Sequence, residues 1–162
     1  MKYRNIAAGL LLAVAGMTVS VAAHAESDCR FTQGYWQNRA QNVGDTTTII
    51  WSELRDLAFY QSGVTYAQTL TIPPRGNPYW ILAHQMVAAQ ANDLNGADPT
   101  GAPGDALNQA ETLLSSYTPA QVAALPKSSP IRQSFIQAAG VLDAWNNGLI
   151  GTGICDGGEQ PH

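Results

Sequence analysis

The chain has two cysteines, Cys29 and Cys155, near opposite ends of its 162 residues. If they bond to each other, both ends of the chain must meet at one place, and everything between them must fold back on itself. In the chain-entropy account, closing so long a loop stabilises the folded state by about 4–5 kcal/mol. Whether the bond forms depends on the compartment, because disulfides persist outside the cytoplasm and are rare inside it.

The N-terminal segment predicts export. Lys2 and Arg4 give it a positive start, an apolar run follows, and residues 23–25 match the A-x-A pattern that signal peptidase cleaves. The apolar run is shorter than the ~20 residues that a membrane-spanning helix needs. We therefore interpret residues 1–25 as a signal peptide and place the mature protein in the periplasm or outside the cell. In that setting the two cysteines predict a structural disulfide.

The charge balance excludes one class of partner. The chain has 12 acidic and 8 basic residues and a net charge of −4 at pH 7, whereas nucleic-acid-binding domains carry a basic stripe. No second apolar run is long enough to span a bilayer. No motif for a phosphate, a dinucleotide or a metal is present, so we expect no cofactor. A surface protein or a polysaccharide remains as the partner.

Capping signals divide the second half of the chain into helices. An Asn, Thr or Ser N-cap followed by proline marks three helix starts, and Asn-Gly pairs mark two helix ends. We expect helices at 78–95, 104–117, 119–125 and 130–147. Apolar side chains repeat at helical spacing in the last of these and predict a face packed on the core: Ile131, Phe135, Ala138, Leu142 and Trp145.

The first half gives weaker signals. A helix is expected at 48–60, although the β-branched residues of 46–50 also suit an extended segment. A capping box at 65–68 predicts a further turn or two of helix, and residues 156–162 look like a disordered tail. The prediction is therefore a single all-α domain at 26–155, with about five helices closed by one N-to-C-terminal disulfide.

Three segments resemble a family of secreted bacterial proteins. The first is 29–38, which resembles the family's opening motif Cys-x-x-Thr-Gln-Gly-Tyr-Trp-Lys-Asn-His, with Gln37 in place of the motif's Lys. Residues 82–98 resemble its central helix and the segment that follows, and 145–155 resemble its closing segment. The resemblance implies export, the disulfide and the helical fold. The family has no established activity and often occurs beside surface or adhesive modules.

The opening stretch has a structural interpretation of its own. Cys29 ties it to the closing segment, Gly34 is expected to let the chain turn, and Tyr35 and Trp36 supply apolar area to the core. Trp36 is also a weak binding candidate, because aromatic pairs could form a platform that stacks on sugars. That platform would consist of Tyr35, Trp36, Tyr79, Trp80 and Trp145.

Three polar residues are the other weak binding candidates. His84 lies beside Gln85 on the polar arc of its helix, so we expect an exposed histidine that titrates near 6.5. Gln90 falls on the apolar face, where a buried amide needs partners, and we expect it to bond the turn at 146–148. Asn147 belongs to that turn. We assign no catalytic residue and no metal ligand.

Two acidic groups carry alternative interpretations. Asp93, Asn95 and Asp98 superficially suggest a calcium loop, but the ligand spacing fails. Glu53 and Asp56 lie one helical turn apart and could serve hydrolysis in principle, although such a pair is usually a solvated surface. The preferred interpretation is an exported, non-catalytic binding or structural module. The alternatives are a small hydrolase that uses His84 or a carboxylate, and a carbohydrate-binding module.

Overall fold

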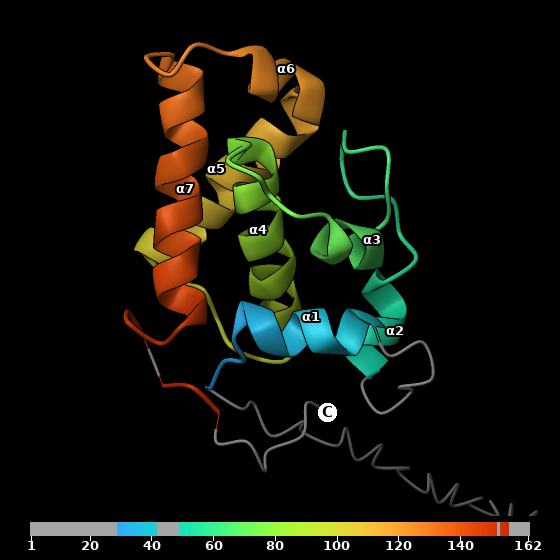
Figure 1. Ribbon diagram of the computed structural model, residues 1–162. Coiled ribbons are helices and arrows are strands. Elements are labelled where there is room, and N and C mark those ends of the chain that lie inside the picture. The colour runs from blue at the N-terminus through green and yellow to red at the C-terminus, as the bar shows by residue number, and fades with distance from the viewer. Residues whose placement is uncertain (1–28, 42–48, 152, 156–162) are drawn as a thin grey trace, which may run out of the picture.

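The computed structural model describes residues 29–41, 49–151 and 153–155, and these residues fold as an all-α structure (Figure 1). The signal peptide predicted at 1–25 and the tail predicted at 156–162 lie outside them. The described part contains seven helices, where about five were expected. They are α1 Gln33–Gln41, α2 Ile49–Leu54, α3 Tyr66–Thr71, α4 Pro78–Leu94, α5 Ala102–Ser116, α6 Pro119–Ala124 and α7 Pro130–Asn146.

Helix α4 runs through the middle of the molecule (Figure 1). Helices α5 and α7 pack on one side of it and α1 to α3 on the other, with α6 against its N-terminal half. Most residues of α4 are consequently buried, on all sides of the helix. No helix among the described residues is long and apolar enough to cross a membrane.

The caps predicted from the sequence start their helices as expected. The Asn77 side chain accepts a hydrogen bond from the Tyr79 backbone N–H at the start of α4. Thr118 forms a capping box before α6, and Thr65 forms one before α3. The apolar face predicted on α7 is confirmed, because Phe135, Ala138, Leu142 and Trp145 are buried and Ile131 packs half-buried against the core.

Two predictions about the first half are wrong. Gly34 does not form a turn but lies in α1, where an added Cβ would meet only the Thr32 hydroxyl at 3.8 Å, an ordinary contact. The helix expected at 48–60 ends at Leu54. After that residue the chain folds into a loop, because the Phe59 N–H donates to the Val64 carbonyl at 2.9 Å and Phe59 itself enters the core.

The two ends of the described chain meet at one end of the molecule. The predicted disulfide joins Cys29 to Cys155, and Arg30 exchanges backbone hydrogen bonds with Gly153 and Cys155 at 3.1 and 2.9 Å. The guanidinium of Arg30 lies over the ring of Trp145, 5.1 Å from its centroid. The disulfide is compatible with the export that the sequence predicts.

Candidate functional site

A row of polar side chains along α4 faces other helices rather than water. The row contains His84, Gln85 and Asn92, whose exposed fractions are 5%, 7% and 0%. The expected exposed polar arc on this helix is therefore wrong. Because α4 is covered on all sides, its polar side is buried as well, and each buried polar group needs a hydrogen-bond partner.

Asn92 joins α4 to the opening stretch and to α7 with four hydrogen bonds. Its Oδ1 accepts from the Phe31 N–H at 2.9 Å and from the Trp36 indole N–H at 3.0 Å. Its Nδ2 donates to the Phe31 carbonyl at 2.9 Å and to Asn146 Oδ1 at 3.2 Å. The first partners are donors only, so they fix which way the Asn92 amide points.

The chain of amides continues through α7 and back to α1. Asn146 Nδ2 donates to the carbonyl and to Oε1 of Gln85, at 3.0 and 2.9 Å. Gln85 Nε2 in turn donates to Gln33 Oε1 at 3.2 Å and to Asp143 Oδ1 at 2.9 Å. Each amide thus uses its oxygen toward one neighbour and its nitrogen toward the next.

His84 lies at the end of this chain. Its Nε2 is 2.9 Å from the Ile72 carbonyl and its Nδ1 is 3.3 Å from Gln33 Nε2. A carbonyl can only accept, so Nε2 carries the hydrogen and Nδ1 accepts from Gln33 in the neutral ring. Burial lowers the pKa of the His84 imidazole below 6.5, and the carbonyl groups of Ile72 and Thr69 act in the opposite direction. The expected titration of an exposed His84 near 6.5 is therefore not supported.

The imidazole forms part of the wall of a surface pocket of about 320 Å³. The other wall residues come from α1, from α3 and from the segment that leads to α4: Gln33, Gln37, Leu70, Thr71, Ile72, Pro73 and Pro74. The amide of Gln37 crosses from α1 to α3, where its Nε2 donates to the Leu70 carbonyl at 3.0 Å. None of the lining residues carries a charge at neutral pH.

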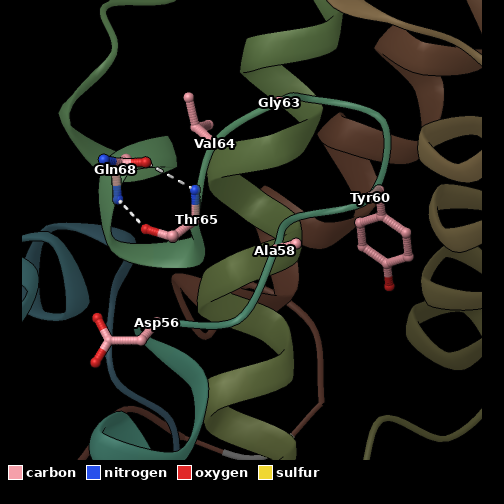
Figure 2. A pocket seen from close by; sticks show the side chains of 7 residues that line it. All are labelled: Asp56, Ala58, Tyr60, Gly63, Val64, Thr65 and Gln68. Atoms are coloured by element: carbon pink, nitrogen blue, oxygen red, sulfur yellow. Dashed lines mark hydrogen bonds between the residues drawn. The ribbon is translucent and has the colours of Figure 1, made fainter.

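A second pocket, of about 310 Å³, lies on the loop between α2 and α3 (Figure 2). It is lined by Asp56, Ala58, Tyr60, Gly63, Val64, Thr65 and Gln68. The capping box between Thr65 and Gln68 occupies much of its polar surface, with hydrogen bonds of 3.0 and 3.3 Å. The Tyr60 side chain points away from Thr65 and Gln68 (Figure 2), and its hydroxyl accepts from Gln90 Nε2 at 3.0 Å.

The remaining binding candidates have structural partners. Gln90 bonds Tyr60 and not the turn at 146–148, so that expectation is wrong; Gln85 and Asn92 supply the contacts to Asn146 instead. The reason is the position of Gln90 on α4, which directs it toward the loop after α2. Asn147 is exposed, and its Nδ2 donates to the carbonyl and to Oδ1 of Asp143, at 2.9 and 3.1 Å.

The aromatic residues do not form an exposed platform. Trp36, Tyr79 and Trp145 are buried, and Tyr35 stacks on Phe31 with ring centroids 4.1 Å apart. Trp80 is half-buried and packs edge-on against Tyr79. These rings lie in the core or pack against it. For Trp36 this agrees with the structural interpretation of the opening stretch.

The acidic alternatives receive no structural support. Glu53 and Asp56 are both exposed, and Asp56 lies 3.6 Å from the Arg55 guanidinium. Across the described residues, no group of three or more histidine, cysteine or acidic side chains is placed to hold a metal ion.

Four residues of the site were not among the sequence candidates: Gln33, Gln85, Asn92 and Asn146. A sequence signal exists for two of them, because Gln85 and Asn92 are two helical turns apart on one face of α4. No protein-family model matches the chain, and no match is found among curated proteins or among solved structures.

Proposed function

We propose that the protein is an exported, non-catalytic binding module of the cell surface or periplasm, and that its ligand site is the pocket between α1, α3 and α4. The observation that carries the proposal is the chemistry of this pocket. Its walls offer amide, hydroxyl and imidazole groups beside aliphatic and proline side chains, with no charged group among them. Such a surface suits an uncharged polar ligand.

The position of His84 supports binding over hydrolysis. Both ring nitrogens are engaged, one with the Ile72 carbonyl and the other with Gln33. A general base in a hydrolase needs a nitrogen that can reach a nucleophile or a water. In this protein the imidazole holds the pocket wall to α1 instead.

A protein segment suits the pocket better than a polysaccharide. Sugar stacking needs an aromatic face, and the lining contains no aromatic side chain. After its bond to the Leu70 carbonyl, the Gln37 amide still has its oxygen and a second N–H, the pair of groups that a peptide backbone offers in return. Gln37 already makes such a contact with the Leu70 carbonyl. The partner is therefore an extended, uncharged segment of a surface protein.

The test is an NMR titration of the mature protein labelled with ¹⁵N. An uncharged peptide of alanine, threonine and proline should shift the side-chain amide signals of Gln33 and Gln37, and a neutral oligosaccharide should not. Gln37→Ala should weaken peptide binding at least about tenfold, which is 1.4 kcal/mol. Gln133→Ala is the matched control, because Gln133 is exposed on α7 and its amide donates to the Lys127 carbonyl outside the pocket.

Two results would contradict the proposal. Shifts produced by the oligosaccharide but not by the peptide would favour a carbohydrate-binding module. Cleavage of either probe, lost in His84→Asn, would favour the hydrolase.

A further inference from the structure

A chain of hydrogen bonds runs from His84 through side-chain amides to Trp36, and at each end of the chain the donor and the acceptor are fixed. At one end the Ile72 carbonyl can only accept, so it fixes the hydrogen on His84 Nε2. At the other end the Phe31 N–H and the Trp36 indole can only donate, so they fix Asn92 Oδ1 as their acceptor. Every amide between the two ends is oriented by its neighbours.

Within this chain, Nδ1 of His84 faces a donor, and the Thr69 carbonyl near the ring only partly offsets the effect of burial on the pKa of His84. Protonation would place a hydrogen on Nδ1, which faces the donor Gln33 Nε2 at 3.3 Å. If the Gln33 amide turned over to offer its oxygen, its nitrogen would face Gln85 Nε2, which is also a donor. Gln85 cannot turn in response, because its Oε1 accepts from Asn146 and its Nε2 donates to Asp143.

The charged groups around the chain do not relieve this conflict. The residues that contact the imidazole or line the pocket beside it are uncharged. Asp143 joins the chain only through Gln85. The charged residues on the segments that carry the chain are Arg30 beside Phe31, Arg39 of α1, Asp93 of α4, and Arg132 and Asp143 of α7, and Arg75 follows the pocket wall at Pro74.

We propose that His84 is a pH-sensitive element of the pocket wall, and that its protonation in mildly acidic solution detaches Gln33 from His84 and weakens ligand binding. The broken contact is the one that joins α1 to the imidazole at the edge of the pocket, so the change occurs where Gln33 and Gln37 line it. The effect of pH on ligand binding rests on the proposed function. The loss of the contact between Gln33 and His84 does not depend on any ligand.

The lowered pKa of His84 sets the direction of the pH effect. The unfolded chain takes up a proton near 6.5 and the folded chain only at lower pH. The stability contributed by the neutral imidazole is therefore fully present above about 6.5, and it is lost as pH falls from there through the folded pKa. The contact between Gln33 and His84 should be lost around the folded pKa itself, since only there does the folded protein take up the proton.

The experiment is a ¹H–¹⁵N NMR titration of the mature protein from pH 7.5 to 5, without ligand. The His84 ring should titrate below 6.5, and the Gln33 side-chain amide and the backbone amides of Thr71 and Ile72 should shift with the same midpoint. The Trp36 indole signal should not follow that midpoint. The proposal would be overturned if the His84 midpoint lay at or above 6.5. It would also be overturned if the Gln33 side-chain amide signals did not change with the His84 midpoint.

An isosteric variant tests the polarity directly. Gln33→Glu keeps the size of the side chain but replaces the donor that faces Nδ1 with an acceptor, so it should raise the His84 midpoint by at least one pH unit, a tenfold gain in proton affinity. Gln37→Glu adds the same charge to the same helix and pocket without contacting the ring, so it should shift the midpoint much less. If the His84 midpoint shifted equally in the two variants, the added negative charge alone would explain the change. That result would contradict the proposal.

Regulation of the site is measured separately. The affinity for the alanine, threonine and proline peptide should be at least fivefold weaker one pH unit below the measured His84 midpoint than at pH 7.5, and this difference should disappear in His84→Asn. An unchanged affinity, with the Gln33 rearrangement present, would refute the regulatory part. Peptide binding that never occurs at either pH would instead refute the proposed function.

Discussion

At the scale of single residues, the buried polar side chains restrict how the helices can pack. Asn92 is fully buried and satisfies four hydrogen bonds with partners from the opening stretch and from α7. Satisfied buried networks favour one arrangement of a core, because alternative packings leave polar groups without partners. Asn92 thus specifies how α1 and α7 meet α4.

We expect Asn92→Ala to lower the free energy of unfolding by more than about 3 kcal/mol. The substitution leaves the Phe31 N–H, the Trp36 indole N–H and Asn146 Oδ1 without their hydrogen-bond partner. Each unsatisfied buried group costs about 1–3 kcal/mol. Urea unfolding at pH 7.5 measures the change. Asn108→Ala is the control, since Asn108 is exposed on α5 and should change stability by less than about 0.5 kcal/mol. Equal small effects would show that the network contributes little.

At the scale of the elements, short helices position the pocket. Helix α3 has only six residues, yet it supplies the Leu70 carbonyl and Thr71 to the wall. So short a helix is marginal by itself and depends on its caps and its packing. The capping box between Thr65 and Gln68 and the burial of Tyr66 and Leu70 provide both.

Thr65→Ala should destabilise the protein by about 1 kcal/mol, because it leaves the Gln68 N–H without its capping oxygen. Thr65→Ser keeps that oxygen and should retain most of the stability. Hydrogen exchange at the amides of Thr69 and Leu70 should become faster in the alanine variant. Unchanged protection there would mean that packing alone holds α3.

At the scale of the whole molecule, the disulfide joins the segments that carry the site. Cys29 precedes α1 and Cys155 follows α7, so the bond fixes the opening stretch beside the end of the last helix. Gln33 and Trp36 of α1 and Asn146 of α7 thereby all reach the buried polar side chains of α4. Residues from 29–38, 82–98 and 145–155 meet in one buried network.

We expect Cys155→Ser to lower the free energy of unfolding by about 2–5 kcal/mol, the usual effect of losing a native disulfide. The wild-type protein measured in reducing agent should match the variant. Cys29→Ser with Cys155→Ser should be no less stable than the single variant, because the single variant leaves one unpaired thiol. If the reducing agent left the free energy of unfolding of the wild-type protein unchanged, the disulfide would not be stabilising the fold.

The sequence by itself determined the local structure. Asn77 before Pro78, Thr118 before Pro119 and the apolar repeat of α7 act within a few residues, so the helix starts and the buried face of α7 could be read directly. The cysteine pair, taken with the predicted signal peptide, also predicted the closure of the fold. Gly34 and the residues after Leu54 were assigned wrongly, because tertiary contacts override local preference there.

Only the tertiary structure decided which polar residues are inside. A helical wheel assumes that one side of α4 faces water, so it placed His84 and Gln85 outside. In the folded protein other helices cover that side as well, and amides from α1 and α7 replace the water. Partners so far apart in the sequence leave no local signal. The environment of His84, and with it the pocket, follows from this long-range packing.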